Sequence, residues 1–363
     1  MSGLQLNPNL KEIPTYQPGR PIEDVARELG LPVEGIIKMA SNENPFGPSP
    51  AAMAAMEKAL GQLNLYPDGN AFYLKQKLAA HVGVEPANLI LGNGSNEIIE
   101  FVGHALLGPG TEVVVSQYCF AVYPIVTRMF GAKLVSVPAK NYGHDLHAML
   151  NAITPQTRLM FVANPNNPTG TVAARADLVD LINNVPPHVL LVMDEAYIEF
   201  LDDVVDFLPF VRREIPNLIL MRTFSKIYGL AGLRVGYGIA AKEITAALEK
   251  IRQPFNLNSM AQAAALAALD DTEHVQRTRA NNFAGREYLE GELRKLKLMF
   301  VPSAGNFILV KVGNGQKVFV ELQKLGVIVR PMGGYDLPEF IRISIGTSTE
   351  NARCIEALRK ALS

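Results

Sequence analysis

Short apolar runs that alternate with helical segments are the feature that most limits the possible folds. Six such runs, each bounded by turn-forming residues, lie at 88–92, 112–116, 133–137, 159–163, 189–193 and 218–221. Continuous apolar strands separated by helices are typical of a mostly parallel sheet that is covered on both faces. Pieces of buried helix also give apolar runs, but the lengths and the flanking Gly, Asn and Pro favour strands. The sequence therefore predicts an α/β fold.

The character of the chain changes beyond Pro254. Residues 258–296 are rich in alanine and then carry charges at helical spacing, which predicts one long or broken helix. Further elements are expected as strands at 307–312, 327–330 and 340–345 and as a closing helix at 351–362. This mixture indicates a second, smaller α+β domain.

Three segments are therefore expected along the chain. Residues 1–40 form an N-terminal arm that joins the small domain and contains a short helix at 22–29. A large domain spans 41–255, and the small domain spans 256–363. Because ligands usually bind in the cleft between two domains, we expect the functional site there.

Composition excludes several classes of function. The chain has 363 residues, of which 48% are hydrophobic, and a formal net charge of −1, as expected of a soluble globular protein. Without a basic excess, nucleic acid is not expected as a partner. No apolar run reaches membrane-spanning length, and residues 1–20 lack the apolar core of a signal peptide, so no membrane association is expected. Cys119 and Cys354 form no C-x-x-C pair, which argues against a structural metal site and fits a reducing cytoplasm.

Lys226 is the most informative candidate for chemistry. It lies in an otherwise uncharged, glycine-containing segment, with Ser225 before it and Arg234 eight residues after it. A lysine that forms an imine must spend time as a neutral amine, so its site must lower its pKa from about 10.4. Ser225 and Arg234 suit a phosphate group. An imine-forming amine beside a phosphate grip is what pyridoxal 5′-phosphate (PLP) needs, although a lone lysine is more often a solvated surface charge.

The loop after the first predicted strand has a pattern that also suits a phosphate. The sequence GNGSNE at 92–97 opens a helix, and the backbone N–H groups of Ser95 and Asn96 at its N-terminus can hold a phosphate. A dinucleotide-binding fingerprint needs a third glycine where Glu97 stands, so that interpretation is excluded. A plain helix cap explains the same residues equally well.

Three polar side chains follow two other predicted strands. Asp194 ends an apolar strand, and a buried acid needs a partner such as a protonated pyridine nitrogen. Asn167 lies in a turn-rich loop and Tyr197 follows Asp194 closely, so both can donate to a phenolate oxygen on a ring. Alternatives stay open. Asn167 also fits turn chemistry, and Asp194 also fits a capping or magnesium-binding acid, although no Walker A segment accompanies it.

Aromatic and arginine side chains complete the candidates. Among Tyr118, Phe120 and Tyr123, one can stack on a flat cofactor, while core packing suits at least two of them. Arg330 and Arg342 lie in predicted strands, where an arginine is costly unless it binds an anion or forms a salt bridge. A two-pronged grip on a carboxylate is the natural use of Arg342.

In this order, and over essentially the whole chain, these motifs resemble the fold-type I PLP-dependent aminotransferases. Within that superfamily the chain is similar to the histidinol-phosphate aminotransferase family. The likeness is carried by ASNENPFGPSP at 40–50, LYPD at 65–68 and VPSAGNF at 301–307. The resemblance implies that the large domain binds PLP and contains a mostly parallel seven-stranded sheet, with the smaller α+β domain beside it.

The resemblance also implies roles around the cofactor. Lys226 would form the imine and then carry the proton between the substrate Cα and C4′ of the cofactor. Asp194 would pair with the pyridine nitrogen, while Asn167 and Tyr197 would contact the 3-oxygen. The residues expected to hold the phosphate are Ser95, Asn96, Ser225 and Arg234.

Other implied roles concern the ring face, the substrate and a partner subunit. Phe120 would stack on the ring, with Tyr118 as the second choice. Tyr66 would reach the phosphate of the other subunit's cofactor, which implies a homodimer with shared sites. Arg342 would bind the α-carboxylate of the amino acid. The further substrate contacts are expected to be Arg330 and Tyr16, on the phosphate of histidinol phosphate, and Asn44.

The reaction that the resemblance implies is ping-pong transfer of an amino group from L-histidinol phosphate to 2-oxoglutarate, in histidine biosynthesis. An aminotransferase of phenylalanine or tyrosine is the nearest alternative, and a PLP decarboxylase of a phosphorylated amino acid is a third. A PLP-binding regulatory domain is disfavoured because Lys226, Asp194 and Arg342 are all present and no DNA-binding segment precedes them.

Overall fold

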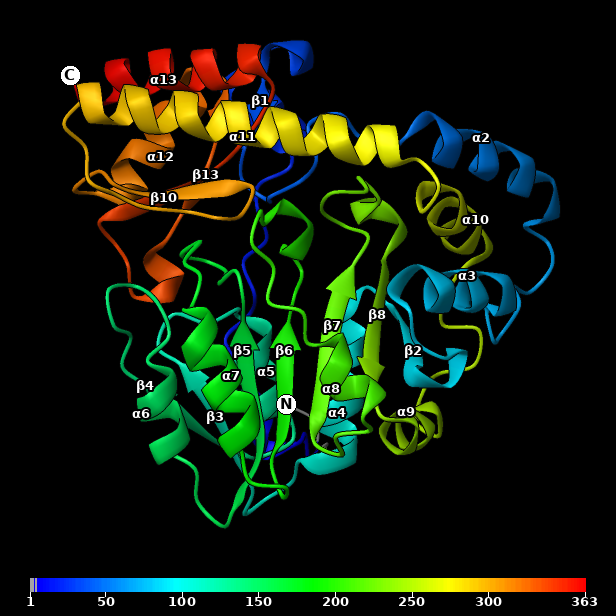
Figure 1. Cartoon of the computed structure of the whole chain (residues 1–363). Coiled ribbons are helices and arrows are strands. Elements are labelled where there is room, and N and C mark those ends of the chain that lie inside the picture. The colour runs from blue at the N-terminus through cyan, green and yellow to red at the C-terminus, as the bar shows by residue number, and fades with distance from the viewer. Residues whose placement is uncertain (1–2, 4) are drawn as a thin grey trace.

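A seven-stranded sheet stands at the centre of the computed structural model, which describes residues 3 and 5–363 (Figure 1). Residues 1, 2 and 4 of the predicted arm lie outside the described residues. The strands are β2 (Leu89–Asn93), β3 (Glu112–Ser116), β4 (Lys133–Val137), β5 (Thr157–Ala163), β6 (Leu190–Asp194), β7 (Leu218–Thr223) and β8 (Val235–Ala240). They lie in the order β2-β8-β7-β6-β5-β3-β4, and β8 alone among them runs against the common direction. The predicted mostly parallel seven-stranded sheet is confirmed.

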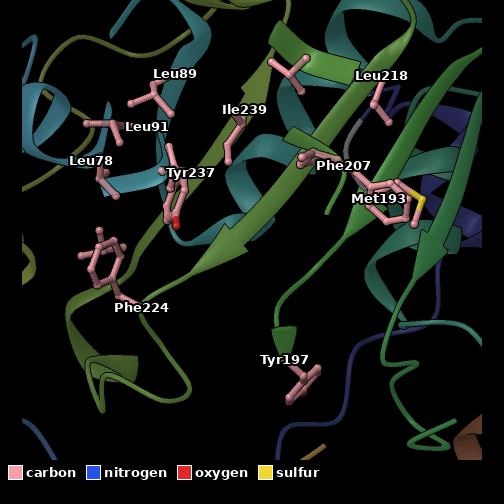
Figure 2. Close-up of a cluster of buried hydrophobic side chains, with 14 of the residues drawn as sticks. Leu78, Leu89, Leu91, Met193, Tyr197, Phe207, Leu218, Phe224, Tyr237 and Ile239 are labelled. Carbon is pink, nitrogen blue, oxygen red and sulfur yellow. The ribbon is translucent and has the colours of Figure 1, made fainter. Parts of the chain in front are cut away.

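Helices cover both faces of this sheet because successive strand residues point to opposite sides. On one face, Val113 and Val192 belong to a core cluster with α4 (Ser95–Leu106), α5 (Val122–Met129) and α9 (Lys242–Glu249). On the other face, Val114 and Met193 belong to a cluster that also includes side chains of β2, β7 and β8, namely Leu89, Leu91, Leu218, Tyr237 and Ile239 (Figure 2). The helices of that second face are α2 (Pro50–Ala59), α3 (Phe72–Val82), α6 (Leu146–Asn151), α7 (Arg175–Asn184), α8 (Leu208–Arg212) and α10 (Ser259–Ala268).

A second, antiparallel sheet of order β12-β13-β10-β9 lies apart from the first (Figure 1). Its strands are β9 (Phe300–Val301), β10 (Phe307–Lys311), β12 (Arg330–Pro331) and β13 (Phe340–Ser344). It packs with α12 (Gly315–Lys324) and α13 (Ser348–Leu362) in a separate core cluster. The arm contributes to the same cluster through α1 (Ile22–Leu29), and its strand β1 (Ile37–Lys38) pairs with β11 (Val327–Ile328). The predicted strand 327–330 is therefore two short strands in different sheets.

The predicted helix over 258–296 is broken into two helices that serve different cores. Helix α10 packs on α2 and α3 in the large cluster, whereas α11 (Thr272–Lys295) carries Leu289 and Leu293 into the small one. The break is marked by Asp271, which caps α11 by accepting a hydrogen bond from the backbone N–H of His274. The boundaries 1–40, 41–255 and 256–363 stay a prediction, and the packing of α10 favours a large domain that extends beyond residue 255. Within the described ranges, no helix has both the length and the apolar character of a membrane span.

Candidate active site

A cavity of about 260 Å³ lies between the two sheets, at the carboxyl ends of β5, β6 and β7. Ligands bind at this edge of parallel sheets because the strand ends and the following loops converge there. Of the residues predicted to form the site, those that line the cavity are Tyr16, Ser95, Asn96, Phe120, Asn167, Asp194, Tyr197, Ser225, Lys226, Arg234, Arg330 and Arg342.

Lys226 follows β7 and projects into the cavity. Its Nζ donates to the carbonyl oxygen of Ser41 at 3.4 Å and lies 5.7 Å from the centre of the Tyr197 ring. Burial, together with the nearby charges of Arg342 and Arg234, lowers the pKa of Lys226 from 10.5 to about 8, while the carboxylates of Glu43 and Asp194 act in the opposite direction. A substantial fraction of the amine is thus neutral near physiological pH, which is the condition for nucleophilic attack on a carbonyl carbon.

Asp194 is the last residue of the fully buried strand β6, so the strand carries a carboxylate to the floor of the cavity. The Tyr123 hydroxyl donates to Oδ2 of Asp194 at 2.5 Å, and the backbone N–H of Ala196 donates to Oδ1 at 3.1 Å. Burial raises the pKa of Asp194 to about 6, while these two hydrogen bonds act in the opposite direction. A buried carboxylate whose two hydrogen-bond donors are both neutral suits a cationic ring N–H.

Asn167 and Arg342 form the hydrogen-bonded pair above that floor. Nη1 of Arg342 donates to Oδ1 of Asn167 at 2.6 Å, and Nη2 donates to the Ala40 carbonyl oxygen at 3.0 Å. Because Oδ1 is occupied, the amide nitrogen of Asn167 is the group left to donate to a ligand. Nε of Arg342 is buried and has no hydrogen-bond partner among the described residues, as expected of a group that awaits an anion.

Ser225, Arg234 and the N-terminus of α4 converge on a phosphate-sized space. Nη1 of Arg234 donates to Oγ of Ser225 at 3.4 Å, and Ser95 and Asn96 begin α4 beside them. Two glycines make the approach possible. A Cβ on Gly94 would lie 2.4 Å from Nη2 of Arg234, and one on Gly236 would lie 2.2 Å from the backbone nitrogen of Ser95. Backbone N–H groups, a hydroxyl and a guanidinium together form an anion cradle.

The structure separates the two aromatic candidates. Phe120 lines the cavity and meets the ring of Tyr123 edge-on at 5.6 Å between centres. Tyr118 does not line the cavity, and its ring stacks on Tyr142 at 6.0 Å. Of these two candidates, Phe120 is therefore the one that can contact a ring bound in the cavity.

A second concentration of positive charge lies at the arm side of the cavity. Arg330 and Arg342 are register partners on the adjacent strands β12 and β13, which brings two guanidinium groups to one end. The guanidinium of Arg330 lies 5.5 Å from the ring centre of Tyr16 and donates to the Gln17 carbonyl oxygen. The arm thus closes this end, which is suited to anionic groups of a substrate.

Residues 34–358 match the sequence profile of the family described as "Aminotransferase class I and II". The chain is 53% identical over 357 residues to the histidinol-phosphate aminotransferase of Akkermansia muciniphila, with 98% of each chain covered. The chain belongs to the histidinol-phosphate aminotransferase family. Identity to histidinol-phosphate aminotransferase 2 of Ralstonia nicotianae is 52% over 367 residues, which cover 99% of this chain and 98% of that one.

This chain has the same fold as solved structures of aminotransferases. The histidinol-phosphate aminotransferase of Sinorhizobium meliloti, solved in complex with pyridoxal 5′-phosphate, is 30% identical and superposes with a TM-score of 0.91, covering 99% of this chain and 98% of that chain. The aspartate aminotransferase of Thermus thermophilus with maleate is 25% identical and has a TM-score of 0.84, covering 99% and 100%. The predicted fold-type I architecture is confirmed by these likenesses.

Two predicted site residues of this family member do not line the cavity. Asn44 is buried and donates through Nδ2 to the Ile227 carbonyl oxygen at 2.8 Å and to Oγ1 of Thr278 at 3.1 Å. It therefore ties the segment after Lys226 to α11. Tyr66 is 82% exposed, and its ring stacks on Phe255 with 4.7 Å between centres.

Two residues that the motif analysis did not assign to the site take part in it. Tyr123, which was considered only as a stacking or core residue, is the donor to Asp194. Asn42 lines the cavity and donates through Nδ2 to the Tyr197 hydroxyl at 2.9 Å. The signal for Tyr123 was its hydroxyl at a core position, since a buried tyrosine normally has a hydrogen-bond partner. Asn42 stands two residues before Asn44 in the same motif, and nothing in the local sequence separates their roles.

Proposed function

We propose that this protein transfers the amino group of L-histidinol phosphate to 2-oxoglutarate, with pyridoxal 5′-phosphate as cofactor and in a ping-pong sequence. The observation that carries the proposal is the juxtaposition in one cavity of Lys226, with its lowered pKa, the buried carboxylate of Asp194 and the anion cradle around Arg234. Relatives about half identical over nearly the whole chain, named histidinol-phosphate aminotransferases, support the substrate.

The residues present fit the cofactor group by group. Bound PLP supplies an electron sink that weakens the bonds at the amino-bearing carbon of a substrate. Lys226 would hold it covalently, Asp194 would face the ring nitrogen, and Phe120 would cover a ring face. The 3-oxygen would be contacted by Asn167 and Tyr197, and the phosphate by Ser95, Asn96, Ser225 and Arg234.

Each site residue then has a defined physical task. Nζ of Lys226, whose lowered pKa leaves a fraction of the amine neutral, would carry a proton between the amino-bearing carbon of the substrate and C4′ of the cofactor. Asp194 would face a cationic ring nitrogen in its ionised form, which the hydrogen bonds from Tyr123 and Ala196 favour. Asn167, which is held by Arg342, cannot rotate its amide away from the ligand.

The two arginines explain how one cavity accepts two different substrates. Glutamate presents carboxylates, whereas histidinol phosphate presents a phosphate ester and no carboxylate. Arg342 would receive the α-carboxylate of glutamate through its unpaired Nε. Arg330 and Tyr16 would receive the phosphate of histidinol phosphate at the arm end of the cavity. Asn44 would act by holding the Lys226 segment rather than by touching the substrate.

A homodimer, with Tyr66 reaching the cofactor phosphate of the partner subunit, is part of the proposal. Its support is a group of exposed apolar side chains between α2 and α3 and at the start of α3, which a monomer would leave in water. These side chains are Leu60, Leu63, Leu65, Tyr66, Phe72 and Tyr73. A cytoplasmic location is also part of the proposal, since Cys119 and Cys354 are free and buried, as is usual in a reducing compartment.

The deciding experiment compares kcat/KM for histidinol phosphate, phenylalanine and tyrosine with 2-oxoglutarate as acceptor. A clear preference for histidinol phosphate supports the proposal, because two arginines and a tyrosine are available to its phosphate. Equal or higher values for phenylalanine would replace it with an aromatic aminotransferase. Release of carbon dioxide without amino transfer would replace it with a decarboxylase.

A further inference from the structure

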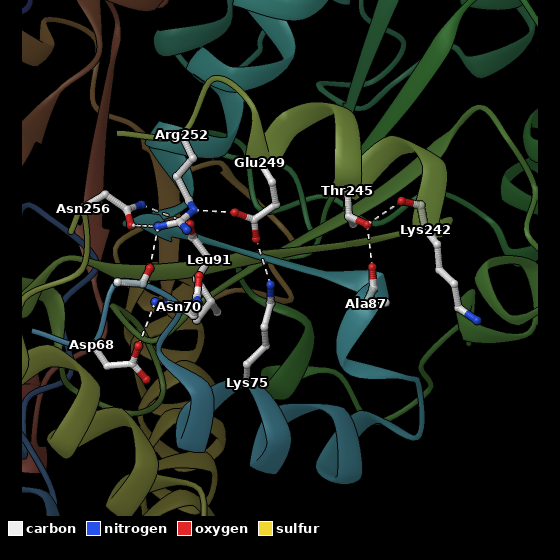
Figure 3. A network of polar contacts seen from close by, with 11 residues as sticks. Asp68, Asn70, Lys75, Ala87, Leu91, Lys242, Thr245, Glu249, Arg252 and Asn256 are labelled. Carbon is white, nitrogen blue, oxygen red and sulfur yellow. Dashed lines mark hydrogen bonds and ion pairs between the residues drawn. The ribbon is translucent and has the colours of Figure 1, made fainter. Parts of the chain in front are cut away.

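A network of polar side chains beside the active site has no role in the reaction described so far (Figure 3). Its centre is Arg252, just after α9. Nε of Arg252 donates to Oε2 of Glu249 at 2.6 Å, and Lys75 donates to the other oxygen of Glu249 at 2.8 Å. Nη1 of Arg252 donates to Oδ1 of Asn256 and to the Gly69 carbonyl oxygen, both at 2.9 Å. The side chain of Arg252 is only 14% exposed, so these bonds are shielded from water.

One end of this network reaches the anion cradle of the same chain, which consists of Ser225, Arg234 and the start of α4 and is called the phosphate cradle from here on. Nδ2 of Asn256 donates to Oε2 of Glu97 at 2.6 Å and to the Leu91 carbonyl oxygen at 3.1 Å. Oε2 of Glu97 also accepts from the backbone N–H of Asn93 at 2.6 Å. Glu97 directly follows the cavity-lining residues at the start of α4, so Asn256 is fixed to the cradle.

The other end reaches the loop that carries Tyr66. Gly69 belongs to this loop, and its carbonyl oxygen is held by Arg252. Gln262 on α10 holds the neighbouring carbonyl oxygen of Asp68 at 2.9 Å. The loop therefore has a fixed backbone, although the Tyr66 side chain at its start is largely exposed.

Phe255 shows that the loop is built to present Tyr66 outward. Its φ is +58°, in the left-handed region that a bulky side chain rarely adopts, and its ring remains 45% exposed under the ring of Tyr66. A strained residue that contributes little to the core is retained where the surrounding structure has another use for it. Here the strain places an aromatic support beneath an exposed tyrosine.

We infer that Arg252 and Asn256 are positioning residues that set the Tyr66 loop at a fixed offset from the phosphate cradle of their own chain. In the proposed dimer, on which this inference rests, Tyr66 serves the partner's cradle. The network therefore fixes the spacing between the two cradles of the dimer, and Arg252 acts on cofactor binding only through Tyr66.

A double-mutant cycle on the dissociation constant of PLP tests this directly, with apoprotein prepared from wild type, Arg252→Met, Tyr66→Phe and the double variant. Arg252→Met and Tyr66→Phe are each expected to weaken PLP binding about tenfold, the cost of one hydrogen bond to a charged phosphate. The double variant should bind PLP no more weakly than Tyr66→Phe alone, because the hydroxyl that Arg252 positions is already gone. Lys242→Met, which removes an exposed ion pair between the first residue of α9 and Glu85, is the matched control and should bind PLP normally.

The outcomes separate this inference from the proposed function. Losses that multiply in the double variant, or an unchanged dissociation constant for Arg252→Met, would overturn the inference and leave the aminotransferase assignment intact. If Tyr66→Phe binds PLP as tightly as wild type, both the shared-site dimer and this inference are ruled out. The proposed reaction is still tested separately, by measuring amino transfer with the wild-type protein. If Arg252→Met does not fold, Phe255→Gly replaces it, since this change relieves the strained φ and removes the support for Tyr66. Sedimentation of each variant must show a dimer before its affinity is compared.

Discussion

The hydroxyl of Tyr123 donates a 2.5 Å hydrogen bond to Oδ2 of Asp194 beneath the active-site cavity. The Tyr123 ring is itself immobilised, because it stacks on Phe161 with 4.4 Å between centres and 7° between planes. Burial raises the pKa of the Tyr123 hydroxyl, so it stays protonated and remains a donor. Tyr123 thus favours the ionised form of Asp194, the carboxylate proposed to hold a cationic ring nitrogen.

Replacing Tyr123 by Phe should make cofactor binding depend more strongly on pH. Without the hydroxyl, the pKa of Asp194 rises further above about 6, and at neutral pH more of the carboxyl is protonated. We expect PLP affinity to fall about tenfold near pH 6.5 and the deficit to shrink as the pH rises. The measurement is the ratio of the dissociation constants of variant and wild type from pH 6 to 8.5. A ratio that does not change with pH would count against this role of Tyr123.

Lys226→Ala should abolish catalysis and the visible absorbance of the bound cofactor. Loss of the proton carrier alone costs about 10²- to 10⁴-fold in rate, and the covalent attachment is lost as well. Turnover and absorbance spectra of the protein after incubation with PLP check this. Lys242→Ala, on the exposed side of α9, provides the control. Persistence of colour and activity in the Lys226 variant would remove Lys226 from its central position.

Lys226 should also destabilise the apoprotein. Its pKa is lowered from 10.5 to about 8, so between these values the unfolded chain binds more protons than the folded one. The free energy of unfolding of the apoprotein therefore rises with pH from about 8 to 10.5. Below pH 8 the destabilisation caused by Lys226 is fully present. Lys226→Met should stabilise the apoprotein at pH 7 by at most about 3 kcal/mol, with a smaller gain near pH 10. Chemical denaturation at the two pH values gives the comparison, and a gain that is equal at both would contradict it.

Arg330→Ala should discriminate between the two substrates. We expect kcat/KM for histidinol phosphate to fall about 10- to 100-fold, because a charge-assisted contact to the phosphate is lost. The half-reaction with glutamate should change much less, since Arg342 is retained. Glutamate therefore serves as the internal control in stopped-flow measurements of each half-reaction. Equal losses for both substrates would show that Arg330 is not specific for the phosphate.

Gly236→Ala should weaken the phosphate cradle by displacing the backbone at the start of α4. The added Cβ would lie 2.2 Å from the backbone nitrogen of Ser95 and must push the start of α4 away from Arg234. We expect PLP affinity to fall at least about tenfold, because a donor to the phosphate is displaced. Gly232→Ala is the control, since a Cβ there meets nothing within 4 Å. Similar PLP dissociation constants for the two variants would be inconsistent with this account.

Local patterns predicted most of the large sheet, and most of the predicted site residues line the cavity. All six apolar runs are strands, because burial on both faces leaves a signal in consecutive residues. Strand β8 was expected only through the family resemblance, since Gly236 and Gly238 interrupt its apolar pattern. These glycines are required by close neighbours, namely Ser95 for Gly236 and Ile219 for Gly238, and no such neighbour is visible in a linear sequence.

Contacts across long sequence separations account for what the motifs did not predict. Tyr123 and Asp194 are 71 positions apart, and Asn42 and Tyr197 are 155 apart, so neither pair leaves a local pattern. Asn44 is a different case. Its contact with the substrate was implied by the family resemblance and stays a prediction, and in the structure its amide nitrogen donates to Ile227 and Thr278.

The phosphate cradle depends on Gly94 and Gly236 as much as on its polar groups. The Arg234 guanidinium occupies the space that a Cβ on Gly94 would take, and the backbone of Ser95 occupies the space that a Cβ on Gly236 would take. Grafting the polar residues alone onto another β-strand and helix would therefore not reproduce the cradle. A transfer of the cradle to another protein would have to include both glycines together with the groups packed against them. The cradle is therefore as sensitive to substitution at the two glycines as at its polar residues.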